Sequence, residues 1–149
     1  MHPATFFFAP PQLTIVTSFM SPPDPFFAND AWARETGIEL VEVSAGRATV
    51  RMKILDRHKN SHGTVHGGVI FTLADIAGAL ASNSHGTPAV GINAHISYVK
   101  AATAGTLYAV AEESSKNPKI ATYTSTVTDD AGEKIAIFQA MVYRKTPGR

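Results

Sequence analysis

The feature that most constrains this 149-residue chain is a long apolar segment with a single charge. Residues 67–84 have the pattern of a helix that begins at a glycine pair and is closed by Gly86 and Pro88. Within it, Asp75 stands alone among aliphatic, alanine and phenylalanine residues. Burying an ionised carboxylate is costly unless a partner compensates for its lost hydration. The pattern therefore predicts a central helix and a functional role for its one acid.

Candidate strands lie on both sides of this helix in the sequence. Two precede it and four follow it, separated by turn residues such as Ser44-Ala45-Gly46 and Asn117-Pro118. The predicted strands span residues 38–43, 47–54, 89–100, 105–115, 119–129 and 133–144. A short helix is also predicted over residues 24–35. Its aromatic residues are expected to pack on the rest of the fold, namely Phe26, Phe27 and Trp32.

The last predicted strand indicates how these elements pack. Ile135 and Ile137 alternate with Ala136 and Phe138, so both faces are apolar and a central strand covered on both sides is predicted. One helix can keep both faces of a sheet of about six strands dry only if that sheet wraps around it. We therefore predict an α+β protein of hotdog fold, an antiparallel sheet of about six strands wrapped around a long central helix.

Length and composition favour one domain. A chain of 149 residues buries roughly 68–70% of its unfolded surface when it folds as one unit, and no repeat or linker divides this one. We predict a single domain over residues 23–146 and a disordered leader over residues 1–22. The leader is apolar, but prolines interrupt it and no basic residue precedes it, so neither a membrane span nor a signal peptide is predicted.

Charge and cysteine content exclude several classes of function. The net charge of +1 provides no electrostatic footprint for nucleic acid, and no basic stripe is present. Without cysteine there is no disulfide scaffold, thiolate metal site or thiol nucleophile. The composition fits a reducing compartment, and we predict a cytoplasmic protein with no nucleic-acid or membrane partner.

A polar turn rich in glycine leads into the central helix. Gly67 and Gly68 allow backbone N–H groups to approach a ligand at the helix N-terminus, where the dipole favours developing negative charge. Asp75 follows about two turns later, on a face of small residues. An oxyanion-type donor followed by a carboxylate is typical of acyl-transfer sites. The simpler interpretations are a tight start to the helix for the glycines and a hydrated surface acid for Asp75.

The same stretch resembles a known family. The pattern consists of Asn60, Gly63, His66-Gly67-Gly68, Phe71, Leu73-Ala74-Asp75, Ala79 and Ala81-Ser82-Asn83. This spacing resembles the PaaI-type (phenylacetic acid degradation) hotdog thioesterases. The likeness covers residues 26–144 and continues through Gly105-Thr106-Leu107, the Gly132 turn and the strand at Phe138.

The resemblance implies hydrolysis of acyl-coenzyme A (acyl-CoA) thioesters at sites built between two subunits. We predict no cofactor. Asp75 would be the general base or the nucleophile, and the backbone N–H of Gly68 would polarise the thioester carbonyl. His66 would lie beside that carbonyl, and Asn60 of the partner subunit would orient the water or the thioester. The residues implied in substrate binding are Gly67, Gly91, Lys116 and Lys119. Gly91 stands where some relatives have a water-positioning serine.

The partner implied is a second copy of the chain, in a dimer or a dimer of dimers, because one hotdog unit leaves a sheet edge uncovered. The sequence does not decide whether the acyl group of the substrate is aromatic or a chain of medium length. The choice between a general base and a mixed-anhydride route also stays open. The alternative function is a non-catalytic acyl-CoA binding module on the same fold.

A metal centre is the competing interpretation of the histidines before the helix. His58, His62 and His66 recur at spacings of four, which on a helix would align three imidazoles. The glycines among them argue for a loop, and no Cys or Glu completes a familiar ligand pattern. We therefore predict no metal site.

Overall fold

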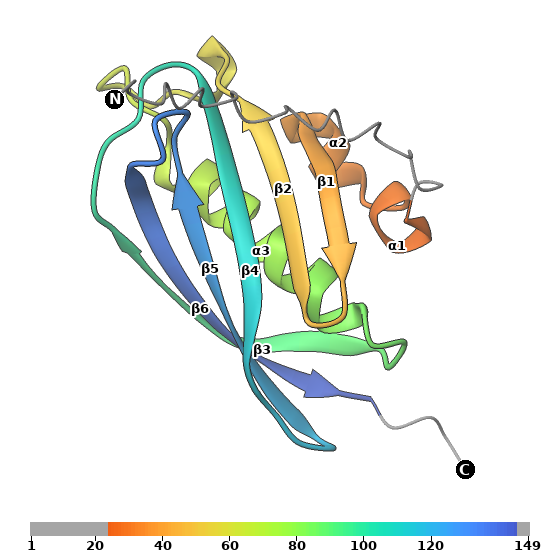
Figure 1. The fold of residues 1–149 in the computed structure, drawn as a ribbon. Helices are drawn as coiled ribbons and strands as arrows, with labels where there is room; N and C mark the ends of the chain where they lie inside the picture. The colour runs from red at the N-terminus through yellow and green to blue at the C-terminus, as the bar shows by residue number, and fades with distance from the viewer. Residues whose placement is uncertain (1–23, 146–149) are drawn as a thin grey trace, which may run out of the picture.

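An antiparallel sheet curls around one long helix in the computed structural model, which describes residues 24–145 (Figure 1). The long helix is α3, Gly67–Asn83. The sheet has six strands in the order β1-β2-β4-β5-β6-β3. Their bounds are Ile38–Ser44 (β1), Arg47–Lys53 (β2), Ala89–Tyr98 (β3), Thr106–Lys116 (β4), Ile120–Thr128 (β5) and Lys134–Arg144 (β6). This arrangement confirms the predicted hotdog fold.

The predicted helix and strands match the observed ones to within two residues at each end. A short 3-10 helix, η1 (Asp56–His58), was not predicted. All of these elements lie inside the predicted domain of residues 23–146. The leader predicted over residues 1–22 lies outside the described residues.

The inner face of the sheet packs on α3 through alternate residues. In β5 the odd-numbered positions are buried, including Tyr123 and Ser125, and the even-numbered ones are half-buried. Ser125 Oγ donates to the carbonyl of Ala74 at 3.0 Å, so the strand approaches the helix backbone closely. Phe71 and Phe138 meet edge to face with ring centroids 5.1 Å apart. No helix between residues 24 and 145 is long and apolar enough to cross a membrane.

The last strand is central, but its outer face is largely open to solvent from Gln139 onward. β6 lies between β5 and β3, as an internal strand should. Phe138 and Val142 are buried against the helix side, whereas Gln139 is exposed and Met141 is 38% exposed. The prediction that both faces are covered was therefore wrong for the single chain.

The helix predicted over residues 24–35 is two short helices. These are α1 (Pro25–Ala28) and α2 (Ala31–Thr36). The break occurs because Asp30 acts as an N-cap, and its side chain accepts a hydrogen bond from the N–H of Ala33 at 2.9 Å. In a continuous helix the N–H of Ala33 would bond to a backbone carbonyl of the preceding turn, so the Asp30 side chain would not be needed to accept from it.

The aromatic residues of this segment have different environments. Phe27 is half-buried and packs on the core, as predicted. Phe26 is 49% exposed and Trp32 is 61% exposed. Placing these two in the core was wrong for the single chain, which leaves two large aromatic side chains at its surface.

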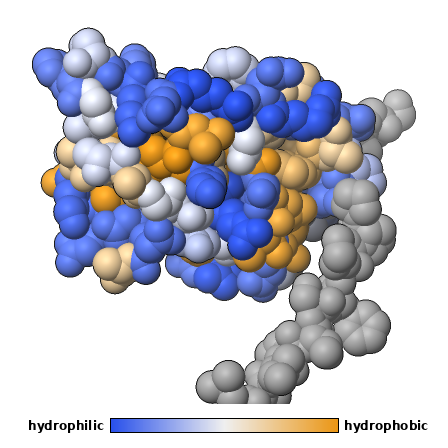
Figure 2. All heavy atoms as spheres, turned by 90° about the horizontal axis from the view of Figure 1, so that it is seen from above, coloured by the Kyte–Doolittle hydropathy of each residue, from blue (hydrophilic) through white to orange (hydrophobic). Residues whose placement is uncertain are grey.

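β3 forms an edge of the sheet with unpaired backbone groups along its outer side. It pairs only with β6, and its residues are exposed apart from Ala89 and Ile96. A β-bulge shifts the register between Gly91 and Asn93. Apolar side chains remain exposed on the single chain, and Figure 2 shows such areas in orange between polar ones. On β3 they are Val90, Ile92 and Tyr98.

Candidate active site

Asp75 lies in the middle of α3 and faces a hollow of about 470 Å³. The helix contributes small residues to this hollow, among them Gly78, Ala79 and Ser82, and the rest of the wall comes mainly from β3 and β6. The carboxylate has no hydrogen-bond or ion-pair partner among residues 24–145. An unpaired acid at the edge of a hollow is free to act on a ligand.

The pKa of the Asp75 carboxyl is raised above its ordinary value. The main cause is desolvation, because the surrounding protein removes part of its hydration although the side chain remains exposed in the single chain. The negative charge of Asp30 adds a smaller contribution in the same direction. A carboxylate with a raised pKa is a better proton acceptor near neutral pH than an ordinary aspartate.

The glycine turn at the start of α3 presents a different N–H from the one predicted. His66 is the N-cap, and its Nδ1 accepts a hydrogen bond from the N–H of Gly68 at 2.9 Å. The predicted donor is therefore engaged inside the turn. The N–H of Gly67 makes no hydrogen bond to any residue between 24 and 145. Of the two glycines, Gly67 is the one that offers a free donor at the helix N-terminus.

Two side chains hold the carbonyls of this turn. Tyr98 Oη, from the end of β3, donates to the carbonyl of Gly67 at 2.9 Å. Thr72 Oγ1 donates to the carbonyl of Gly68 at 2.9 Å and accepts from Trp32 Nε1 at 3.2 Å. A Cβ at Gly67 would lie 3.1 Å from the Tyr98 ring, so a glycine allows this close approach. The sequence offered no signal for Tyr98, which lies 31 residues from Gly67.

Gly67 and Asp75 of one chain are too far apart for direct attack on a shared carbonyl. Eight residues along α3 separate them by about 12 Å along the axis and about 80° around it. A nucleophile must lie about 3–3.5 Å from the carbonyl carbon, while the donor bonds the carbonyl oxygen. The turn and the acid were predicted to belong to one site, and helix geometry does not support that within a single chain.

Asn60 holds its own loop in the single chain. Its Oδ1 accepts from the N–H of His62 at 2.9 Å and from that of Thr64 at 3.3 Å, and its Nδ2 donates to Thr64 Oγ1 at 3.0 Å. It does not line the Asp75 hollow. Its role toward a substrate bound to the partner subunit stays a prediction.

Gly91 lines the Asp75 hollow together with Asn93, which the sequence analysis missed. The β-bulge between these residues places an extra residue in β3 and changes the alternation of its side chains. Gly91 was assigned from the family resemblance, and a bulge that brings Asn93 to the same wall leaves no signal in a single sequence. Asn93 contributes an amide, a group that can orient water, to the wall of this hollow.

The two lysines predicted to bind substrate are on or beside the β4–β5 hairpin. Lys116 Nζ lies 3.5 Å from Glu113 Oε1 and 3.3 Å from His85 Nε2, just beyond the C-terminal end of α3. That end is about 25 Å along the helix from the glycine turn. Lys119 Nζ lies 5.8 Å from the centre of the Tyr143 ring. Substrate binding by Lys116 and Lys119 stays a prediction.

The histidines do not assemble a metal centre within residues 24–145, where no group of three His, Cys, Asp or Glu side chains is placed to hold a metal ion. His58 is buried, and its Nδ1 accepts from the N–H of Leu55 at 3.0 Å. His66 caps α3, and His62 is exposed in the loop. Each of these histidines has a separate environment.

A free N–H at a helix N-terminus, an unpaired carboxylate and a hollow beside it are the kinds of feature from which acyl-transfer sites are built, and this hotdog fold carries all three. Comparison with known proteins agrees. Residues 62–136 match the Thioesterase superfamily, and the chain belongs to that family.

Relatives place it among the PaaI-type members. It is 41% identical to a protein of Archaeoglobus fulgidus named "Putative esterase", over 81% of this chain and 79% of that protein. It is 32% identical to the acyl-coenzyme A thioesterase PaaI of Escherichia coli, over 79% of this chain and 85% of that protein. The solved structure of E. coli PaaI superposes with a TM-score of 0.79 at 31% identity and covers 81% of this chain and 88% of that one. A Streptococcus mutans protein solved with acetyl-CoA superposes with a TM-score of 0.71 at 26% identity, over 75% of this chain and 91% of that one.

Proposed function

We propose that this thioesterase hydrolyses acyl-CoA to the free acid and coenzyme A. The observation that carries the proposal is Asp75, an unpaired carboxylate with a raised pKa at the edge of a hollow. Either it removes a proton from water that attacks the thioester carbonyl, or it attacks that carbon itself and forms a mixed anhydride. The N–H of Gly67 would stabilise the negative charge that grows on the carbonyl oxygen.

We place the reacting carbonyl between two chains. Because Gly67 and Asp75 of one helix are about 12 Å apart along its axis, a complete site needs the glycine turn of one chain opposite Asp75 of another. His66 and Asn60 belong to the same end of the fold as Gly67 and would accompany it. From the sequence, only Asn60 was assigned to the partner subunit. Gly67 and His66 now join it there, opposite Asp75.

The edge of β3 supports this pairing. Lys, Asp, Glu and Pro are the residues that usually prevent edge strands from pairing, and β3 contains none of them. Pairing β3 with β3 of a second copy would continue the sheet. It would also bring that copy against the Asp75 hollow, since Gly91 and Asn93 of β3 line its wall. A dimer formed through β3, and a dimer of dimers built from it, belong to the proposal.

The first test is a panel of acyl-CoA thioesters with a dye that detects free thiol. We expect release of coenzyme A from at least one aromatic or medium-chain thioester. Tight binding of the panel without thiol release would favour the acyl-CoA binding module instead.

We also propose a location in the cytoplasm. The absence of cysteine is compatible with that compartment, and cell fractionation would test it.

Subunit complementation tests the shared site. The two variants are Asp75→Asn and Asn60→Asp, each of which keeps the shape of the replaced side chain. The carboxylate in Asn60→Asp would still accept hydrogen bonds from the N–H groups of His62 and Thr64, so the loop should keep its structure. If each variant alone is inactive, random exchange makes half of the dimers mixed, each with one intact site, so about a quarter of wild-type activity should return. A mixture without activity after verified exchange would place both groups in one chain's site, and full activity of Asn60→Asp alone would remove the amide from the mechanism.

A further inference from the structure

Two hollows adjoin at the C-terminal half of α3 and share two lining residues. The first is the Asp75 hollow, of about 470 Å³. The second has a volume of about 290 Å³ and lies near the C-terminal end of α3, where Leu80, Gly86 and Pro88 line it. Phe26 and Asn83 line both hollows and therefore stand at their boundary.

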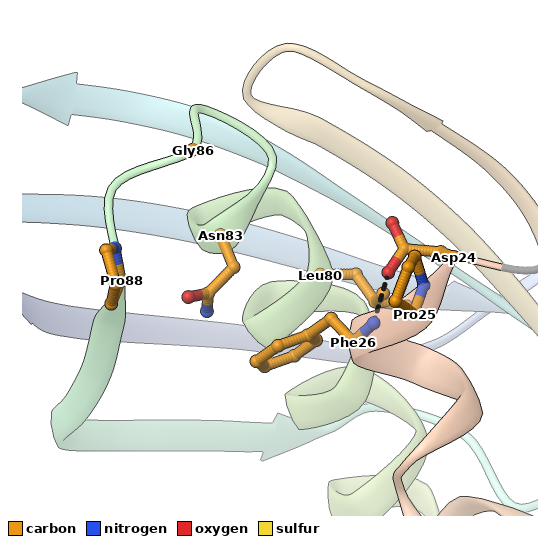
Figure 3. Close-up of a pocket in the computed structure, with 7 residues that line it drawn as sticks. All are labelled: Asp24, Pro25, Phe26, Leu80, Asn83, Gly86 and Pro88. Atoms are coloured by element: carbon orange, nitrogen blue, oxygen red, sulfur yellow. Dashed lines mark hydrogen bonds between the residues drawn. The ribbon is translucent and has the colours of Figure 1, made fainter.

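Phe26 is the less restrained residue of this boundary. Figure 3 shows its ring reaching from α1 along the side of α3 toward Asn83. The Asn83 side chain is fixed, because its Nδ2 donates to the carbonyl of Ala79 at 2.9 Å and its Oδ1 accepts from the N–H of Ala89 at 3.0 Å. The Phe26 ring has no such restraint and is 49% exposed.

The fold does not require the Phe26 side chain. No residue of α1 is buried. The helix is held instead by Asp24, whose Oδ1 accepts from the N–H groups of Phe26 at 2.8 Å and Phe27 at 3.3 Å, and by Phe27 packed on the core. Both restraints involve the backbone or the neighbouring side chain. A large apolar side chain that contributes little to the core and faces a hollow is placed to contact a ligand.

The geometry relates Phe26 to the length of the substrate. Asp75 and Asn83 are eight residues apart, so the first hollow runs about 12 Å along the helix from the acid to the boundary. Its helix side is made of Gly78, Ala79 and Ser82, which leave room for a chain lying along α3. A thioester whose carbonyl lies at Asp75 and whose acyl group follows this hollow would extend toward Phe26.

We infer that Phe26 is the specificity-determining end wall of the acyl pocket. It limits the linear acyl chain that the enzyme accepts, and the second hollow is an extension of that pocket which the Phe26 ring closes off. This inference rests on the proposed function.

The test compares Phe26→Ala with Val41→Ala. Val41 is a matched control because it is also about half exposed, at 50%, and lies in β1 at the opposite edge of the sheet. For each variant, kcat/KM is measured with linear acyl-CoA thioesters from butanoyl to hexadecanoyl and with phenylacetyl-CoA. Circular dichroism verifies the fold, and Phe26→Leu provides a second, more conservative variant.

Opening the boundary should favour long chains. Each methylene that becomes buried contributes about fourfold in affinity, so two or more should raise the hexadecanoyl-to-octanoyl ratio of kcat/KM at least about tenfold in Phe26→Ala. Phe26→Leu should fall between it and wild type, and Val41→Ala and all butanoyl-CoA rates should stay within about twofold. An unchanged ratio in folded Phe26→Ala, with active wild type, would overturn this inference alone. A wild-type protein that hydrolyses none of the thioesters would overturn the proposed function as well.

Discussion

Asp75 on α3 and Glu113 on the neighbouring strand β4 are two carboxylates with opposite surroundings. Asp75 faces a hollow and has no partner among the residues that the structure describes. Glu113, on β4 near the C-terminal end of α3, is enclosed by donors. Its Oε2 accepts from Tyr123 Oη at 2.9 Å and lies 2.6 Å from His85 Nε2, and Lys116 Nζ lies 3.5 Å from Oε1.

The two environments move the two pKa values in opposite directions. Desolvation, reinforced by Asp30, raises the pKa of Asp75. Desolvation acts the same way on Glu113, but the hydrogen bonds from His85 and Tyr123 and the nearby positive charge of Lys116 outweigh it and lower its pKa. Glu113 has the larger cluster of polar groups, yet its bonding capacity is already used within the fold. The carboxylate without partners is the one left for chemistry.

Asp75→Asn should have the largest effect. The amide keeps the shape of the side chain but neither accepts a proton nor attacks a carbonyl, so kcat should fall by about 10²–10⁴-fold. Because the folded protein holds the ionised form of Asp75 unfavourably, the variant should unfold at the same temperature as wild type or higher at neutral pH. Turnover above about a tenth of wild type, measured on purified folded protein, would remove Asp75 from the mechanism.

Tyr98→Phe sharpens the role of the glycine turn. The variant keeps the ring against Gly67 and loses only the hydrogen bond to its carbonyl. We expect kcat to fall about three- to tenfold with little change in KM, in line with the loss of one hydrogen bond of about 1 kcal/mol. Tyr108→Phe, a half-buried tyrosine on β4, is the control. Equal effects of both substitutions on kcat would argue against positioning by Tyr98.

Glu113→Gln tests whether the carboxylate that is bonded within the fold contributes to stability rather than to catalysis. The free energy of unfolding should fall by about 1–2 kcal/mol at neutral pH, while kcat stays within about twofold. Because the folded pKa of Glu113 is lowered, its stabilisation is present above the ordinary glutamate pKa of about 4.3 and is lost as pH falls through the folded value. The free energies of unfolding of wild type and Glu113→Gln, measured in urea, should differ at neutral pH and become equal at acid pH. A large loss of turnover in the folded variant would make Glu113 part of the catalytic machinery.

Asp30→Asn should have the smallest effect, a displacement of the pH profile. In the proposed mechanism Asp75 acts in its ionised form, so kcat/KM should fall as pH decreases through its raised pKa. Asp30 contributes to that rise, so its neutralisation should move the acid limb to lower pH. Asparagine remains a good N-cap for α2, which keeps the bond from the Ala33 N–H. An acid limb that does not move would show that desolvation alone sets this pKa.

The sequence predicts regular elements well because their signal is local. Residue alternation and turn residues located all six strands, and a long run of apolar residues located α3. The break between α1 and α2 was missed because Asp30 was counted as an ordinary helical residue rather than as a cap. Local pattern also does not show which strand lies at the edge, so the pairing of β3 with β6 came only from the structure.

The candidate site was predictable in its residue types and less so in its contacts. Asp75 stands out in any reading of the helix, and Gly91 does line the hollow beside it. The choice between the N–H groups of Gly67 and Gly68 depends on the orientation of one imidazole, which sequence does not encode locally. Tyr98 and Phe26 reach the site from distant segments, and only the packing of the chain brings them there.

The strand order also sets a sequence of events for folding. Following the chain, β2 pairs with β1, β4 with β2, β5 with β4 and β6 with β5, so the sheet grows from one side in nearly the order of synthesis. β3 is the exception, because it emerges before β4 and has no partner until β6, which ends at Arg144, is complete. Closing this long connection is a slow, non-local step. A nascent chain that lacks β6 therefore exposes both an unpaired β3 and the Asp75 side of α3. Protease should cleave β3 more readily in a ribosome-stalled chain that ends before β6 than in the released protein.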